Sequence, residues 1–238
     1  MSVEGRSVLI IGGTSGLGYA TAKSFVNRDA RVGIVGRDEA KAEQAAASLG
    51  AGVVSGALDA TDAVALESFM ARFGPVDHLV SFTGLQPAAP VSEADHDMFS
   101  SAFDARVWVA RNCCAIAAPR MPPDGSFTFC SGLSALRPRP GRSPGAVATA
   151  ALESFCRAMA VELSPIRVNA LCPGAFDTEV LRRFLGSDPV DGLERLGSSI
   201  PLGRVGKPEE IAHAVHFLVT NTYTTGITLR VDGGALLQ

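Results

Sequence analysis

Short apolar runs alternate with longer stretches of helical periodicity from one end of the chain to the other. The apolar runs cover residues 8–11, 32–35, 53–57, 79–82, 127–130, 168–172 and 228–231. The helical stretches lie near residues 17–27, 39–49, 62–72, 95–118, 147–163 and 208–219. Strands this apolar are buried on both faces, which is typical of a parallel sheet with helices on each side. The order of elements predicts an α/β fold with a doubly wound sheet of seven parallel strands.

Two irregular stretches interrupt the alternation. Residues 179–201 precede the last helix and strand, and residues 137–142 carry Arg137, Arg139 and Arg142 between a strand and a helix. Ligands of doubly wound sheets bind at the carboxyl ends of the strands, so residues 179–201 are expected to form a substrate lid. The arginine-containing loop is either a wall of the same site or a solvated connector. No internal repeat or linker divides the chain, and residues 1–238 are expected to form one domain.

Composition excludes several classes of protein. With 47% hydrophobic residues the chain is not a disordered one, and a formal net charge of -3 gives no electrostatic basis for binding nucleic acid or an anionic membrane. No apolar run approaches the length of a membrane span, and the first residues lack the layout of a signal peptide. The five cysteines have no metal-type spacing, and no metal site is expected. We therefore expect a soluble cytoplasmic protein with reduced thiols.

A glycine-rich loop follows the first apolar run and opens the first helix. Gly12, Gly16 and Gly18 allow a tight turn, close approach of the backbone to a pyrophosphate, and close packing of helix on strand. The free N–H groups at the start of the helix then face the phosphates, with Thr14, Ser15 and Leu17 completing the loop. The alternative is a glycine-rich turn that holds no ligand. The strand before the loop and the helix after it favour a dinucleotide site.

The end of the second strand favours NADP(H) over NAD(H). An NAD site normally carries an acidic residue here, but this chain has Gly36 and Arg37. The small residue leaves room for a 2′-phosphate, and the Arg37 guanidinium is a charged donor to it, with the hydroxyls of Thr14 and Ser15 nearby. Alternatively, Arg37 is a surface residue at the start of the next helix.

Over nearly its whole length the chain resembles the short-chain dehydrogenase/reductase family. The matching pieces are residues 12–18, Leu58-Asp59, residues 166–170, Pro173-Gly174, Asp177-Thr178, Thr225-Gly226 and residues 231–234. The resemblance implies a three-layer Rossmann fold, with Asp59 holding the adenine and Pro173, Gly174 and Thr178 lining the nicotinamide side. After the fourth strand the family usually has Asn-Asn-Ala-Gly; residues 81–84 read Ser-Phe-Thr-Gly, so Gly84 keeps only the backbone approach.

The catalytic positions depart from the family pattern. The family uses a Ser, a Tyr, a Lys four residues beyond it, and an Asn on an earlier helix. The same alignment puts Gly132, Gly145, Thr149 and Arg106 at these four positions, and no Tyr-x-x-x-Lys occurs anywhere in the chain. General acid–base catalysis worth roughly 10²–10⁴ in rate is therefore missing unless another group supplies it.

Three residues are candidates for a substitute role. Arg106 interrupts an otherwise apolar helix, so its guanidinium either holds a substrate carboxylate, polarises a carbonyl oxygen, or pairs with Asp104 or Asp59. Ser131 and Ser134 follow the fifth strand and either bind a substrate oxygen or cap the end of the strand.

We expect an NADP(H)-dependent oxidoreductase that acts on the carbonyl or alcohol group of an anionic or bulky small molecule. The alternatives are a catalytically silent NADP-binding sensor or partner subunit, and a non-redox isomerase or dehydratase. The resemblance also implies a homodimer or homotetramer, formed through the helices near residues 101–118 and 147–163. Their small side chains either pack against a second copy or against the sheet of their own subunit; these are Ala110, Cys113, Cys114, Ala117, Ala151 and Ala158.

Overall fold

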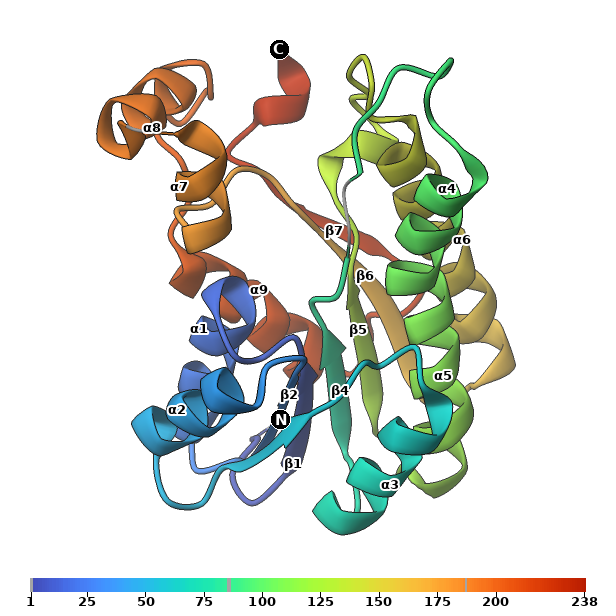
Figure 1. Ribbon diagram of the computed structural model, residues 1–238. Coiled ribbons are helices and arrows are strands. Elements are labelled where there is room, and N and C mark those ends of the chain that lie inside the picture. Colours follow the sequence, from blue (N-terminus) through green and yellow to red (C-terminus); the bar gives the residue numbers. More distant parts are fainter. Residues whose placement is uncertain (1, 85–86, 187) are drawn as a thin grey trace.

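A computed structural model describes residues 2–84, 87–186 and 188–238 (Figure 1). Its strands form one sheet in the order β3-β2-β1-β4-β5-β6-β7, and every neighbouring pair is parallel. The strands are β1 (Ser7–Ile11), β2 (Arg31–Gly36), β3 (Val54–Ala57), β4 (His78–Ser81), β5 (Ser126–Cys130), β6 (Arg167–Pro173) and β7 (Thr228–Val231). The predicted doubly wound parallel sheet is confirmed, and its direction of winding changes between β1 and β4.

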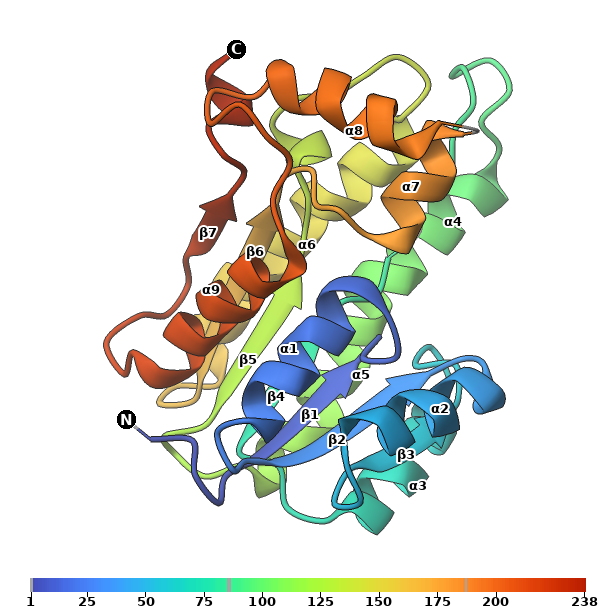
Figure 2. The same cartoon turned by 90° about the vertical axis from the view of Figure 1, so that its left-hand side faces the viewer.

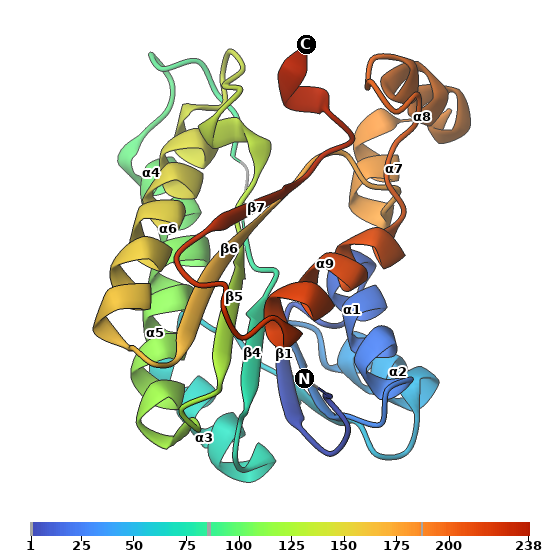
Figure 3. The ribbon, with the colours of Figure 1, turned by 180° about the vertical axis from the view of Figure 1, so that it is seen from behind.

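Helices cover both faces of the sheet because its strands are apolar on both sides. Helices α1 (Gly16–Val26), α2 (Glu39–Leu49) and α9 (Pro208–Thr220) lie over one face, as Figure 2 shows. The opposite face carries α3 (Ala63–Phe73), α5 (Val109–Ala117) and α6 (Ser143–Glu162) (Figure 3). Successive residues of β1 serve the two layers in turn: Leu9 and Ile11 belong to one buried cluster, and Val8 and Ile10 to the other.

Two predicted segments differ from the expectation. The stretch near residues 95–118 is α4 (His96–Phe103), a π-helical turn (Asp104–Trp108) and α5. Residues 179–201, expected only as an irregular segment, contain α7 (Glu179–Leu185) and α8 (Pro189–Ser198). In Figure 1 these two helices lie at the end of the sheet where the strands terminate, near the C-terminus of the chain. Residue 187 within this segment lies outside the described residues.

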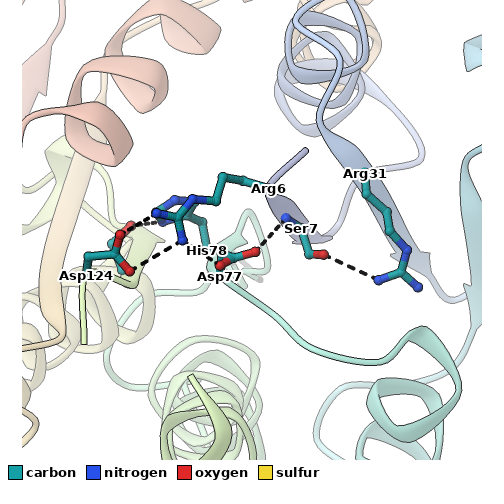
Figure 4. A network of polar contacts seen from close by, with 7 residues as sticks. Arg6, Ser7, Arg31, Asp77, His78 and Asp124 are labelled. Atoms are coloured by element: carbon teal, nitrogen blue, oxygen red, sulfur yellow. Dashed lines mark hydrogen bonds and ion pairs between the residues drawn. The ribbon is translucent and has the colours of Figure 1, made fainter. Parts of the chain in front are cut away.

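A network of polar side chains links the segments at the amino ends of β1, β4 and β5, at the end of the sheet away from α7 and α8 (Figure 4). The Asp77 carboxylate accepts from the Arg6 Nη1 and from the backbone N–H of Ser7, both at 2.8 Å. Arg6 also pairs with Asp124, just before β5. The loops that enter three central strands are thus joined through one guanidinium, far along the strands from the glycine-rich loop.

The small side chains of α5 pack inside their own subunit. Ala110, Cys113, Cys114 and Ala117 are all buried in the core cluster of that layer. Of the two alternatives, the structure favours packing against the sheet of the same subunit for this face of α5, whereas Ala151 on α6 is half-buried and Ala158 is exposed. The exposed apolar side chains of this layer are others, including Trp108 and Val161. Among the helices described here, none is long and apolar enough to cross a membrane.

Candidate active site

The glycine-rich loop leaves the carboxyl end of β1 with the geometry that phosphate binding requires. Gly12 (φ +79°) and Gly16 (φ +52°) adopt the left-handed region that favours glycine. A Cβ on Gly18 would lie 2.0 Å from the carbonyl oxygen of Gly12, so the helix can start this close to the loop only with glycine at this position. The helix is packed against the loop as the motif predicts.

The start of α1 is open to an anion. Ser15 stands at the N-cap, but its side chain makes no capping hydrogen bond, and the first turn holds no acidic residue. By contrast, Asp38, Asp62 and Asp95 cap α2, α3 and α4. The first N–H groups of a helix have no intrahelical acceptor, and here the Ser15 side chain does not accept from them either. These residues fit a dinucleotide, whose phosphates would accept from these N–H groups.

Gly36 has a packing reason to be small, in addition to the predicted room for a 2′-phosphate. A Cβ there would lie 2.6 Å from the Cγ2 atom of Thr14 and 2.8 Å from its Oγ1 atom. The missing side chain therefore accommodates Thr14 of the glycine-rich loop, which packs over the end of β2. Arg37, the next residue, is exposed at this edge and is available to a ligand.

Asp59 lies close to Arg37 on the same edge. Its Oδ1 atom accepts from the backbone N–H and the hydroxyl of Thr61, at 2.9 and 2.8 Å. These hydrogen bonds, and to a smaller extent the charge of Arg37, hold the pKa of the Asp59 carboxyl below its ordinary value. The carboxylate is fixed at the end of β3, where the family resemblance implies a contact with adenine.

The chain that follows β6 returns to the glycine-rich loop. A Cβ on Gly16 would lie 3.5 Å from the Cγ2 atom of Thr178, and Thr178 caps α7 by accepting from the N–H of Leu181 at 3.2 Å. Gly174 packs so closely on β7 that a Cβ would lie 2.7 Å from the Cα atom of Asp232. The fold therefore brings the segment of Pro173, Gly174 and Thr178 to the edge that holds the glycine-rich loop.

The positions of the family's Tyr and Lys are buried and hold no titratable group. Gly145 and Thr149 lie inside α6, and the Thr149 hydroxyl is 2.9 Å from the carbonyl oxygens of both Gly145 and Ala146. Ser134 lies 3.1 Å from the same hydroxyl. Since Thr149 donates its single proton to a carbonyl oxygen, Ser134 donates to Thr149 and is left with acceptor capacity toward a ligand.

The Ser131 hydroxyl is engaged within the protein. It is buried, and its hydroxyl donates to the Oε1 atom of Glu153 at 2.8 Å. Glu153, a buried carboxylate on α6, was not among the predicted site residues. The available signal was its spacing, because Thr149, Glu153 and Cys156 fall on one face of the helix and all three are buried. The arrangement favours a structural role for the Ser131 hydroxyl.

Arg106 lies on the π-helical turn with 6% of its surface exposed. The expected ion pair with Asp104 or Asp59 does not form, and no other carboxylate of the described residues pairs with it. Instead its Nη1 atom donates to the carbonyl oxygens of Cys130 and Ser131, at 3.1 and 3.3 Å. Burial lowers the pKa of the guanidinium, which nevertheless stays charged near neutral pH.

The arginine-containing loop, residues 137–142, contacts three neighbouring segments. Arg137 donates to the carbonyl oxygen of Ala235 at 2.7 Å, and the Arg142 guanidinium lies 5.6 Å from the ring centre of Phe184 on α7. The carbonyl oxygen of Gly141 accepts from the N–H of Ala89 at 3.0 Å. The loop therefore joins the C-terminal turn and α7 to the segment before α4.

The buried thiols are poor nucleophiles. Burial raises the pKa of the Cys172 thiol to about 11, so the thiolate is scarce near neutral pH. Within residues 2–84, 87–186 and 188–238 no group of three or more His, Cys, Asp or Glu side chains is arranged to hold a metal ion.

A family model described as enoyl-(acyl carrier protein) reductase matches residues 12–235. The short-chain dehydrogenase/reductase ATR9 of Stachybotrys chlorohalonatus is 31% identical over 257 residues, which cover 100% of this chain and 99% of that protein. The chain belongs to the short-chain dehydrogenase/reductase family. Members of this family use nicotinamide cofactors, and the chain is an oxidoreductase of this type.

Two solved structures of other proteins are similar to this chain in fold. L-sorbose reductase from Gluconobacter frateurii, solved with NADPH and L-sorbose, has a TM-score of 0.94 and 27% identity, covering 100% of this chain and 98% of that one. A short-chain oxidoreductase of Pseudomonas aeruginosa PAO1, described as containing an atypical catalytic center, has a TM-score of 0.91 and 25% identity over 98% of both chains. A fold similar to that of this chain thus occurs in a protein described as having an atypical catalytic center.

Proposed function

We propose that this chain binds NADP(H) and catalyses hydride exchange with the carbonyl or alcohol group of a small molecule. The observation that carries the proposal is the junction of the glycine-rich loop, the open start of α1 and Thr178 at one edge of the sheet. Gly12, Ser15, Gly16, Leu17 and Gly18 would hold the pyrophosphate. Asp59 would hold the adenine, and Gly84, Pro173, Gly174 and Thr178 would hold the nicotinamide end.

Arg37 is the basis for proposing NADP(H) over NAD(H). It occupies the position where an NAD site carries an acidic residue, it is exposed, and it is free to point toward a 2′-phosphate. Thr14 packs against the adjacent Gly36 and keeps its hydroxyl near the same place. The L-sorbose reductase bound to NADPH is a relative with the same fold, which supports this choice of cofactor.

On the substrate side we assign Arg106 and Ser134. When bound, the cofactor supplies or accepts the hydride. Arg106 contributes a fixed positive charge beside the substrate oxygens, and Ser134 accepts a hydrogen bond from the hydroxyl group of the alcohol form of the substrate. Neither can deliver a proton near neutral pH, so the proton comes from water. The Pseudomonas relative with an atypical catalytic center supports a working site outside the usual pattern.

The segment of α7 and α8 would close over the substrate. We also propose that the protein is cytoplasmic and forms a homodimer or homotetramer.

The direct test of the enzymatic proposal is to follow the loss of NADPH absorbance with a panel of carbonyl compounds, and the appearance of NADPH absorbance when NADP⁺ is mixed with the corresponding alcohols. Turnover that Arg106→Met reduces by about 100-fold or more is expected. Binding of NADPH with no turnover across the panel would contradict the enzymatic proposal.

One observation favours a second candidate, a cofactor-binding protein without turnover. Gly132 and Gly145 carry no side chain, and the Thr149 hydroxyl is committed to a contact within the protein, so three of the family's four catalytic positions offer no group to a substrate. A second dehydrogenase-like chain that purifies with this one would support a silent partner subunit. Turnover by the isolated chain would exclude it.

A further inference from the structure

The charge of Arg106 lacks a counterion among the described residues. The side chain is buried, and its hydrogen bonds to these residues both come from Nη1 and both go to neutral carbonyl oxygens. Its Nε atom is buried without a hydrogen-bond partner. A buried cation and an unsatisfied donor are both costly, so the folded chain leaves strong binding capacity for an anion at this place.

The unused edge of the guanidinium has the shape of a carboxylate receptor. With Nη1 occupied, Nε and Nη2 remain, and one N–H bond of each points in the same direction from one edge of the guanidinium, within its plane. The same edge of Arg182 holds Asp177 in this chain, with Nε–Oδ1 at 2.5 Å and Nη2–Oδ2 at 2.7 Å. Two parallel donors match two carboxylate oxygens, whereas a single carbonyl oxygen satisfies only one of them well.

The guanidinium is also held in place. A Cβ on Gly84 would lie 2.7 Å from the Cζ atom of Arg106 and 2.8 Å from both Nη atoms, so the group lies flat against the glycine. The carbonyl oxygens of Cys130 and Ser131 fix one end of it. Gly84 follows β4 and Cys130 ends β5, so the fixed charge stands at the edge of the sheet where ligands bind in this kind of fold.

We propose that the Nε–Nη2 edge of Arg106 binds a carboxylate of the substrate, and that the substrate is an oxo acid or the corresponding hydroxy acid. This inference rests on the proposed function and narrows it. In the reducing direction a hydride adds to the carbonyl carbon, the π electrons of the C=O bond move to its oxygen, and a water molecule protonates that oxygen and leaves as hydroxide to the solvent. NADPH is oxidised to NADP⁺, the oxo acid is reduced to a hydroxy acid, and the carboxylate is unchanged.

The test is a calorimetric titration of the full chain, without cofactor, with benzoate and with its neutral analogue benzamide. Wild-type protein is expected to bind benzoate and to prefer it over benzamide. Arg106→Met is expected to lose about 30-fold or more of the benzoate affinity and none of the benzamide affinity. Arg106→Lys keeps the charge but loses the paired donors, so its benzoate affinity is expected to fall between the two.

Equal affinity for benzoate and benzamide, or no benzoate binding up to about 10 mM, overturns the proposal. Unchanged benzoate affinity in Arg106→Met overturns it as well. If Arg106→Met does not fold, Gly84→Ala replaces it. The added Cβ displaces the guanidinium and is expected to weaken the binding of benzoate but not that of benzamide. The proposed function fails separately: absence of NADPH binding or turnover refutes that function, while benzoate binding still reports on the carboxylate site.

Discussion

At the scale of single residues, the glycines of the carboxyl edge leave room for other parts of the protein. Gly18 lies against the carbonyl oxygen of Gly12, Gly36 lies under Thr14, and Gly84 lies under the guanidinium of Arg106. The close packing at Gly18 was predictable from the sequence, because the loop motif prescribes it. The packing partners of Gly36 and Gly84 were not predictable, since a partner distant in sequence leaves no local pattern.

Gly18→Ala is expected to lower the free energy of unfolding by about 2 kcal/mol or more and to abolish dinucleotide binding, because the added Cβ collides with backbone. Gly52→Ala is the matched control. A Cβ on Gly52 would meet no other atom within 4 Å, so this substitution is expected to change stability by less than about 0.5 kcal/mol. Urea denaturation checks both variants, and equal stability of the two would contradict the packing argument.

Substitution of the two serines after β5 is expected to have different effects, one mainly on stability and the other mainly on activity. Ser131→Ala leaves the buried Glu153 carboxylate without its donor and is expected to cost about 1–3 kcal/mol of stability, with little change in kcat/KM. Ser134→Ala is expected to lower kcat/KM about 10-fold with a smaller loss of stability, because Thr149 keeps its carbonyl partners. Denaturation and steady-state kinetics on both variants test this, and the reverse assignment would return Ser131 to the catalytic role.

At the scale of elements, the strands were predictable and the helical interruptions were not. Apolar runs that serve both faces identify a parallel strand directly, as the alternation of Val8 to Ile11 between two core clusters illustrates. The π-helical turn that carries Arg106 leaves the apolar pattern almost unchanged, so residues 95–118 read as one helix. Helices α7 and α8 escaped notice because they are short and largely exposed.

The start of β4 gives a pH dependence to the stability of the sheet. His78 is buried, its Nδ1 atom lies 2.9 Å from the Ser126 hydroxyl, and burial lowers its pKa to about 4. Of the charges around it, Asp77 and Asp124 oppose this shift, whereas Arg167 and Arg6 add to it. The unfolded chain therefore binds a proton that the folded chain does not, between pH of about 6.5 and about 4.

The contribution of the neutral, buried His78 side chain to the free energy of unfolding is therefore complete above a pH of about 6.5 and is lost as the pH falls toward about 4. Between pH 7 and pH 5 this residue is expected to cost the wild type about 2 kcal/mol of unfolding free energy. His78→Gln, which can still bond Ser126, is expected to lack that part of the loss. Parallel urea curves at the two pH values measure it, and identical pH dependence in both proteins would refute the assignment.

At the scale of the whole molecule, a polar network lies at one end of the sheet and the candidate site lies at the other. The amino ends of β1, β4 and β5 are joined by Arg6, Asp77 and Asp124, whereas the carboxyl ends carry the candidate site (Figure 4). The meeting of the glycine-rich loop and Thr178 at that edge was predictable from short motifs. The substrate half was not, because the partners of Ser131 and Arg106 come from elements distant in the chain.

Self-association is expected to use the exposed apolar side chains of the π-helical turn and of α6, which include Trp108 and Val161. Trp108 is 47% exposed, and Trp108→Glu is expected to weaken association about 100-fold by placing a charge in the interface. Val64→Glu is the matched control, because Val64 is 75% exposed on α3. Sedimentation at several concentrations measures the oligomeric state, and a monomeric wild type or an equal effect of both variants would contradict this interface.

The proposed function depends above all on the carboxyl edge of this sheet being an NADP(H) site. Calorimetric titration with NADPH and with NADH, on the wild type and on Arg37→Gln, is the decisive experiment. We expect micromolar binding of NADPH to the wild type and a preference over NADH that Arg37→Gln reduces by about 10- to 100-fold. Arg120→Gln, at an exposed site on the far end of the molecule, should keep that preference. Binding of neither nucleotide to the folded wild type would contradict the assignment of this edge as a cofactor site.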